Sequence, residues 1–252
     1  TVVLGALTLF IMTGSLSADP FVDDVIDVEF GDSRDVMYED PAVVIGPPRA
    51  FDDQGLGGST DVLNIGIGGA VTVEFTDNEI YNGPGTDFVV FENPFYIGGD
   101  FDRVFVEPGF VAVSSDGENF VQFPADYVVQ DPPLESGDDD PTHYVNFAGI
   151  NPVYSHPENE IDPLDPEQSG GDAFDLETIR DEAASAGVDI NHIRFVKIED
   201  VVRRTGVDKD GDVIPGSTLP TVNGFDLDAV AAIHSRIPEH LANANPVWSM
   251  YE

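Results

Sequence analysis

The chain has 252 residues and no cysteine, and its 48 acidic against 10 basic side chains leave a formal net charge of −38 at pH 7. This charge argues against nucleic acid as a partner, because a phosphate backbone binds a stripe of basic side chains. Repulsion on this scale destabilises a compact state unless cations bind or screen it, which favours a protein that works in salty or calcium-containing water. With no cysteine, neither a disulfide framework nor a lipid-anchored cysteine can form.

The first residues predict a signal peptide whose start is missing. An apolar run over residues 1–12 is followed by small residues and then by Asp19-Pro20. This run is too short to span a membrane and fits the core of a leader cleaved near Ser17 or Ala18. The alternative is a buried N-terminal strand. We therefore expect a leader over residues 1–18, one secreted domain over residues 19–252, and no transmembrane segment in the mature chain.

The mature chain predicts a mainly β protein, a β-sandwich with long loops and one short helix. Apolar segments with alternation, separated by turn residues, predict strands at residues 71–75, 88–92, 110–114, 120–123, 193–198 and 225–233. A helix is expected over residues 176–186, with Asp175 as its N-cap and Gly187 at its end. Asp116-Gly117 predicts a hairpin closed by a two-residue type I′ turn. Residues 125–171 and 203–223 form long acidic loops of the kind that usually serve a function or are disordered.

The strongest metal signal is Asp208, Asp210 and Asp212, spaced two apart around Gly211. Such alternate carboxylates at a tight turn suit Ca²⁺, which takes six to eight oxygen ligands. The spacing is not that of an EF-hand, because the twelfth position is Leu219 instead of a glutamate. A shorter calcium loop remains, and the alternative is a solvated acidic turn.

A second acidic pair, Asp226 and Asp228, lies within an apolar strand. Alternation places both carboxylates on one face and Phe225, Leu227 and Ala229 on the other. Two like charges on one face of a nearly buried strand are costly unless a cation lies between them. A calcium-ligand role is therefore expected, and the alternative is an edge strand with a wet face.

Further acids have weaker support as calcium ligands. Asp87 and Glu92 flank the apolar residues 88–91, and Asp172 and Asp175 lie in the segment just before the predicted helix. Helix capping explains the last pair equally well.

Enzyme signatures are poorly supported. Ser33 follows Gly31-Asp32, as in a class of hydrolases, but the expected C-terminal partner motif and alternating helices are missing. The five histidines are scattered without zinc-site spacing. Paired carboxylates for glycoside hydrolysis could be chosen anywhere among 48 acids. No catalytic residue is predicted.

Several blocks carry a resemblance to known proteins. VSSDGENFVQFP (residues 113–124) and IRFVKIED (193–200) resemble the hairpin and closing strand of discoidin or galactose-binding-like jelly rolls. The blocks VIGPPRAF (44–51), LNIGIGGAVTVEFTDNEIYNGPGTDFVVFENPF (63–95), GGDAFDL (170–176) and NGFDLDAVAAIH (223–234) resemble a family of bacterial secreted or cell-surface proteins that often carry a C-terminal surface-sorting segment. This resemblance implies location and architecture more than activity.

We therefore expect a secreted or cell-surface calcium-binding module without catalytic activity, which binds carbohydrate or a surface protein. Two alternatives stay open, a glycan-active hydrolase on the same scaffold and a subunit of a calcium-dependent extracellular assembly that self-associates.

Overall fold

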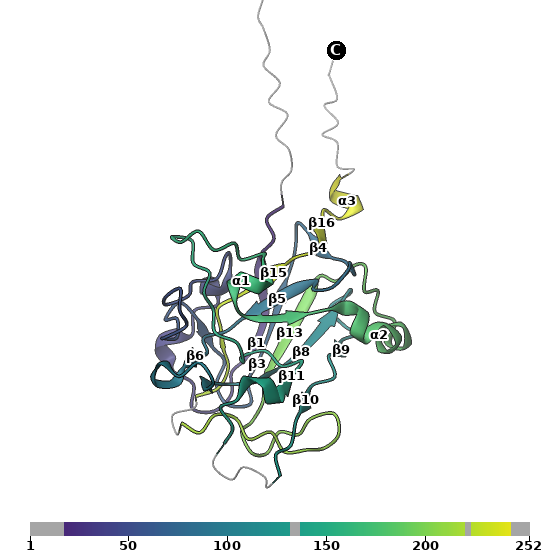
Figure 1. Cartoon of the computed structure of the whole chain (residues 1–252). Coiled ribbons are helices and arrows are strands. Elements are labelled where there is room, and N and C mark those ends of the chain that lie inside the picture. The colour runs from purple at the N-terminus through teal and green to yellow at the C-terminus, as the bar shows by residue number, and fades with distance from the viewer. Residues whose placement is uncertain (1–17, 132–136, 220–222, 243–252) are drawn as a thin grey trace, which may run out of the picture.

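The computed structural model describes residues 18–131, 137–219 and 223–242. Strands account for 28% of the structure and helices for 15%, which confirms a mainly β protein. The strands form several antiparallel sheets (Figure 1). The expected leader, residues 1–18, lies outside the described residues except for Ala18.

The larger sheet is antiparallel and has the order β1-β3-β13-β8-β9. In its centre β13 pairs with β3 on one side and with β8 on the other, so that Val196 lies opposite both Val73 and Val113. The strands are Asp24–Glu29 (β1), Ala70–Glu74 (β3), Phe195–Asp200 (β13), Gly109–Ser114 (β8) and Val121–Gln122 (β9).

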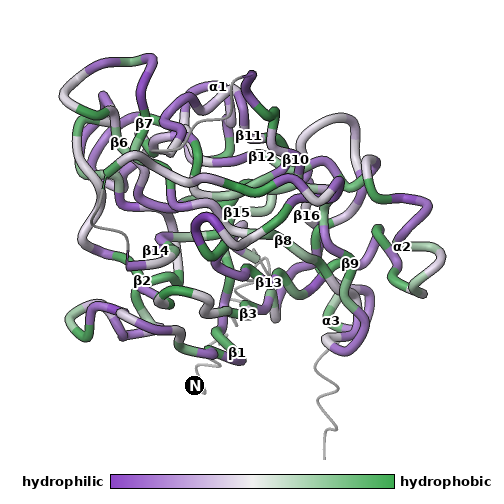
Figure 2. Tube along the Cα trace, turned by 90° about the horizontal axis from the view of Figure 1, so that it is seen from below, coloured by the Kyte–Doolittle hydropathy of each residue, from purple (hydrophilic) through white to green (hydrophobic). Residues whose placement is uncertain are grey.

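A smaller sheet of order β12-β5-β15 packs against it (Figure 1). Its strands are Asp172–Phe174 (β12), Phe88–Phe91 (β5) and Ala229–Ala232 (β15). All residues of β5 and β15 are buried, because Phe88 and Val90 face the core between the sheets while Val89 and Phe91 face a second apolar cluster under the loops. Figure 2 shows the hydrophobic stretches along the central strands and frequent hydrophilic stretches in the surrounding loops.

Short strand pairs and helices complete the fold. The pairs are Leu63–Asn64 (β2) with Asp226–Leu227 (β14), Glu79–Ile80 (β4) with Ser235–Arg236 (β16), Phe95–Tyr96 (β6) with Val104–Phe105 (β7), and Asp126–Tyr127 (β10) with Tyr144–Val145 (β11). The α-helices are Pro166–Ser169 (α1), Arg180–Ala186 (α2) and Glu239–Ala242 (α3), and the 3₁₀ helices are Val36–Tyr38, Pro41–Val44, Ile97–Gly99, Pro141–His143 and Leu176–Ile179. None of the helices in the described part of the chain has the length and apolar character needed to span a bilayer.

The predicted strands are all present, and the last one is divided. The predicted helix is also confirmed, with a 3₁₀ first turn over Leu176–Ile179 followed by α2. The expectation of one short helix is wrong, because α1 and α3 are also present. The Asp175 carboxylate caps it by accepting from the Glu177 N–H, and Gly187 ends it in the left-handed conformation.

The hairpin turn was predicted wrongly. β8 and β9 do pair, but residues 115–120 connect them, and of the expected turn residues only Gly117 has positive φ. The Asp116 carboxylate instead accepts from the backbone N–H groups of Glu118 and Asn119, each at 2.8 Å. These side-chain bonds stabilise a longer loop in place of the tight turn.

Candidate cation-binding site

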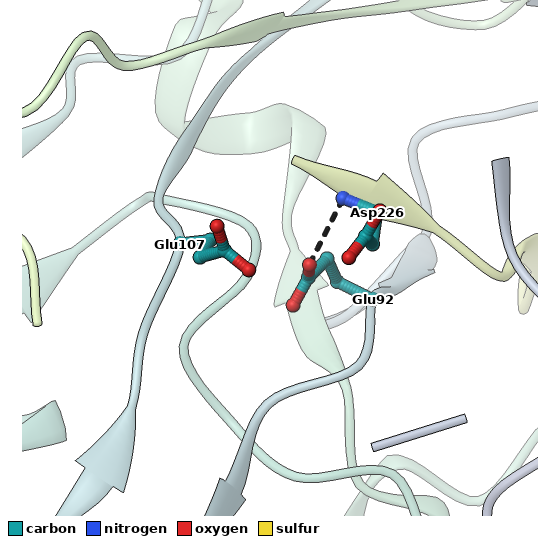
Figure 3. A group of neighbouring side chains, drawn as sticks. All are labelled: Glu92, Glu107 and Asp226. Atoms are coloured by element: carbon teal, nitrogen blue, oxygen red, sulfur yellow. Dashed lines mark hydrogen bonds between the residues drawn. The ribbon is translucent and has the colours of Figure 1, made fainter. Parts of the chain in front are cut away.

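Three acidic side chains from distant parts of the chain meet in the interior: Glu92, Glu107 and Asp226, which we name the acidic trio. Glu92 directly follows β5, Glu107 lies shortly after β7, and Asp226 begins β14. Figure 3 shows their carboxyl groups facing one another across a small space. One ligand atom from each lies within 4.8 Å of the others, a spacing that fits one metal ion.

The trio is almost closed to solvent, since Glu92 is 1% exposed, Glu107 3% and Asp226 7%. The Glu92 Oε1 atom accepts from the Asp226 backbone N–H at 2.9 Å, shown dashed in Figure 3. The Glu92 Oε2 atom is buried and has no hydrogen-bond partner among the described residues. A buried carboxylate oxygen without a donor is costly, so this atom marks the place where a cation or another donor is required.

Two asparagines, the buried Asn64 and the half-buried Asn93, fix the orientation of Asp226. Asn64, opposite Asp226 in the β2–β14 pair, donates its Nδ2 to Oδ1 at 2.6 Å, and Asn93 donates its Nδ2 to Oδ2 at 3.2 Å. Each asparagine also bonds to a backbone carbonyl, Asn64 to that of Asn223 at 3.1 Å and Asn93 to that of Ser59 at 3.3 Å. The carboxylate is thereby held before any ion binds.

Gly224 allows the chain just before β14 to lie close to the backbone of Gly66. Its φ is +92°, and a Cβ at this position would lie 2.2 Å from the carbonyl carbon of Gly66. Only glycine tolerates both conditions. Phe225 and Asp226 follow directly, so this glycine brings β14 against β2 and Asp226 into the site.

Burial is the main cause of the raised pKa values of the three carboxyl groups in the trio. It raises the pKa of Glu92 well above its ordinary value, and the charges of Glu107 and Asp226 raise it further. Burial likewise raises the pKa of Glu107, assisted by Asp226 and Asp200. For Asp226 burial raises the pKa to about 6, although its bonds to Asn64 and Asn93 act in the opposite direction. A divalent ion would offset both the burial and the mutual repulsion.

Of the predicted ligands, Glu92 and Asp226 come together, and Asp228 lies elsewhere. Both oxygens of Asp228 face the Arg49 backbone N–H, at 2.8 and 3.1 Å, and burial raises its pKa to about 8. The expected alternation is wrong beyond Leu227, because Ala229 packs in the cluster under the loops while Phe225 and Leu227 pack between the sheets. The chain leaves β2 at Asp228, whose N–H bonds to the Phe91 carbonyl at 2.9 Å, and continues as β15 beside β5.

Asp87 forms a separate buried cluster. It is fully buried and accepts from the backbone N–H groups of Gly83 and Leu176, both at 2.7 Å, and pairs with His234 Nδ1 at 2.8 Å. Its oxygens are thus occupied by protein donors. Asp172 is similar, since it accepts from the N–H groups of Ile150 and Asn151, and burial raises its pKa to about 7.

The Asp208 loop forms a tight turn held by its own first carboxylate. The Asp208 Oδ1 atom accepts from the backbone N–H groups of Asp210 and Asp212, both at 2.9 Å, and Oδ2 accepts from that of Tyr127 at 2.9 Å. Asp210 pairs with Lys209, and the side chain of Asp212 is exposed. Within the described part of the chain, the acidic trio is the group with metal-site spacing, and these three aspartates do not form one.

These contacts predict that Asp208→Ala destabilises the protein by about 2 kcal/mol, equally in calcium and in chelator, because three backbone donors lose their acceptor. Asp210→Ala and Asp212→Ala should each change stability by less than about 0.5 kcal/mol. Urea unfolding of the three variants, in calcium and in chelator, measures these changes in the free energy of unfolding. A loss of bound calcium in Asp210→Ala would instead restore the calcium-loop interpretation.

Sequence reasoning missed Glu107 and the two asparagines. A signal for Glu107 exists, since this single acid interrupts the apolar residues 104–111. Asn64 follows Leu63 and Asn93 follows Glu92, and only the place of the two asparagines in the fold shows their role.

A comparison with models of known protein families and with curated proteins found no match to this chain.

Proposed function

We propose that this chain is a secreted or cell-surface calcium-binding module whose fold depends on an ion held by Glu92, Glu107 and Asp226. The observation that carries this proposal is the buried Glu92 Oε2 atom without a partner, inside a group of three carboxylates spaced for one ion. In this proposal the module has no catalytic role, and its loops bind carbohydrate or a protein partner.

The donor set favours calcium over softer metals. All three ligands supply carboxylate oxygen, which suits a hard cation. Calcium accepts variable ligand numbers and loose geometry, whereas Mg²⁺ requires a nearly octahedral shell and retains water. A site so deeply buried leaves little room for that water.

The proposed location and fold family have separate support. The net charge of −38 suits an extracellular protein that meets free calcium. The two packed antiparallel sheets are compatible with the jelly-roll, galactose-binding-like sandwich that the hairpin and closing-strand segments resemble.

The hydrolase alternative has less support from this site. Glycoside hydrolysis needs two carboxylates on either side of a bound sugar. Glu92 and Glu107 have raised pKa values, but they are only 1% and 3% exposed, so a glycan has no access to them.

The test is calcium titration calorimetry on the chelator-treated protein. We expect micromolar affinity for the wild type, in the range of protein calcium sites. Asp226→Asn keeps the shape but removes a ligand charge, and it should weaken binding at this site at least about a hundredfold, a loss of about 2.7 kcal/mol. Asp27→Asn, which removes an exposed acid of β1, serves as the matched control. Equal calcium uptake by all three proteins would refute the proposal.

A further inference from the structure

A pocket open to solvent lies between the loop that follows Ala50 and the turn that follows Ser155. Its volume is about 350 Å³, within the range of small-molecule sites in proteins. The backbone joins its two sides, since the Ala50 N–H donates to the Ser155 carbonyl at 3.1 Å. We name it the loop pocket. Its lining side chains are Phe51, Asp52 and Asp53 from the first segment and His156, Glu158 and Asn159 from the second.

The second segment is held in one conformation by Asn159. The Asn159 Oδ1 atom accepts from the backbone N–H groups of His156 and Ile161, at 3.2 and 3.1 Å. Its Nδ2 atom donates to the Tyr154 carbonyl at 2.8 Å. Side-chain bonds of this kind fix a turn locally. This side of the loop pocket is therefore formed before any ligand arrives, which lowers the entropy cost of binding.

Phe51 gives the loop pocket an exposed aromatic ring. The residue is 67% exposed, although it directly follows the buried Ala50. A Cβ at Gly57 would lie 2.6 Å from the Phe51 Cδ1 atom, so the ring lies close against the backbone of this glycine. The ring thus has support on one side and remains open to solvent. A ligand with an apolar face gains free energy by covering it.

Two aspartates supply hydrogen-bond acceptors. The Asp52 Oδ1 atom accepts from the backbone N–H groups of Gln54 and Leu56, at 2.8 and 3.1 Å, which fixes the carboxylate. Among the residues that the structure describes, neither Asp52 Oδ2 nor the Asp53 carboxylate has a hydrogen-bond donor. These oxygens are available to the hydroxyl groups of a ligand.

His156 supplies a donor. Its Nδ1 atom accepts from the Glu158 backbone N–H at 3.0 Å. A neutral imidazole that accepts at Nδ1 carries its proton on Nε2, so the Nε2–H group can donate. No acceptor for it exists within the described part of the chain.

This combination matches the chemistry of a sugar ring. A pyranose has hydroxyl groups around its edge, which bond to carboxylates and to an N–H donor, and C–H groups on its faces, which pack on an aromatic ring. The carboxylates of Asp52, Asp53 and Glu158 repel acidic sugars. The pocket volume suits a single small ring rather than a protein surface.

We infer that the loop pocket binds one unit of a saccharide without acidic groups. The sugar ring packs on Phe51, its hydroxyl groups donate to Asp52 and Asp53, and one of its oxygens accepts from His156 Nε2–H. This inference rests on the proposed function for the carbohydrate-binding role of the loops, and it gives that role a place. The loop pocket shares no residue with the acidic trio.

The test is calorimetric titration of the calcium-loaded chain with single sugars. The probes are the methyl glycosides of glucose, galactose, mannose and N-acetylglucosamine, together with glucosamine and glucuronic acid. At least one neutral or amino sugar should bind with a dissociation constant of about 1 mM, usual for so small a ligand, and glucuronic acid at least about tenfold more weakly. Preference for glucosamine would indicate that the carboxylates bind its ammonium group, and preference for a neutral sugar that they bind hydroxyl groups; either supports the proposal.

Variants locate the binding in this pocket. Phe51→Ala and Asp53→Ala should each weaken the binding at least about tenfold. Phe101→Ala is the matched control, because it removes a ring that is 65% exposed and lies outside the pocket, and it should leave the affinity unchanged. Unchanged affinity in both pocket variants overturns the proposal. So does the absence of binding by every neutral and amino sugar at about twentyfold above the expected constant, or binding of glucuronic acid as tight as theirs.

Calcium uptake separates this proposal from the proposed metal site. Phe51→Ala removes an exposed side chain, so the variant should bind calcium and melt as the wild type does. Normal calcium uptake by a wild type that binds no sugar would overturn the saccharide site alone. Sugar binding by a wild type that takes up no calcium would support the saccharide site and leave the acidic trio without its ion.

Discussion

Addition of 1 mM calcium to the chelator-treated protein should raise its melting temperature by about 10 °C. A ligand present at about a thousand times its dissociation constant stabilises the native state by about 4 kcal/mol. For a chain of this size each kcal/mol shifts the melting temperature by about 2–4 °C. The expected effect is large because Glu92, Glu107 and Asp226 are buried together, and the ion offsets their repulsion in the native state alone.

The change in melting temperature caused by Glu107→Gln should be opposite in sign in chelator and in calcium. In chelator the variant should melt higher than the wild type, since a neutral amide replaces a carboxyl group whose ionisation is opposed by burial and by neighbouring charges. In calcium it should melt lower, because the ion has lost a ligand. Scanning calorimetry of both proteins in both buffers measures the crossover, with Glu118→Gln in the exposed 115–120 loop as the control. If NaCl alone stabilised the wild type as much as calcium does, general screening of an acidic surface would explain the effect, and the site would lose its support.

The stabilisation by calcium should grow with pH as the carboxyl groups of the trio lose their protons, which for Asp226 happens at about pH 6. In the metal-free protein the raised pKa values mean that the folded state keeps protons which the unfolded state has released. This stability is complete below about pH 4 and is lost as pH rises through the folded values, about 6 for Asp226, about 7 for Asp172 and about 8 for Asp228. Each such group contributes a slope of about 1.4 kcal/mol per pH unit inside its window.

Bound calcium reverses this dependence for the trio. The ion holds Glu92, Glu107 and Asp226 ionised, so its contribution is present at high pH and is lost as protons compete for the carboxylates. Asp172 and Asp228 do not belong to the trio, and their slopes should persist in calcium.

Urea unfolding at pH 4.5 to 8.5, in calcium and in chelator, measures how the free energy of unfolding depends on pH with and without the ion. Asp228→Asn is the informative control, because it should flatten the chelator curve near pH 8 without changing the increment due to calcium. An increment that is constant across this range would mean that calcium does not compete with protons at buried carboxylates. The acidic trio could then not be its site.

The local features of the chain could be read directly from its sequence. Segments rich in Val, Ile and Phe located β3, β5, β8 and β13, because such residues favour strands. Asp175 and Gly187 delimited the helical segment, since capping depends on neighbours a few residues away. The spacing of Asp208, Asp210 and Asp212 identified a tight turn, and the function of its first carboxylate proved to be the closing of that turn.

The sequence by itself thus determined a strongly acidic, mainly β chain and marked Glu92 and Asp226 as acids in apolar strands. Tertiary structure alone decided that these two meet, 134 positions apart in the chain, and that Glu107 joins them while Asp228 and Asp87 bind protein donors instead. The physical reason is that a metal site is formed by side chains at the ends of different strands. Which strand ends become neighbours is decided only when the sheets pack. Pairing across long stretches of chain is fixed by the packing of both sheets together, and no local pattern around a single carboxylate contains it.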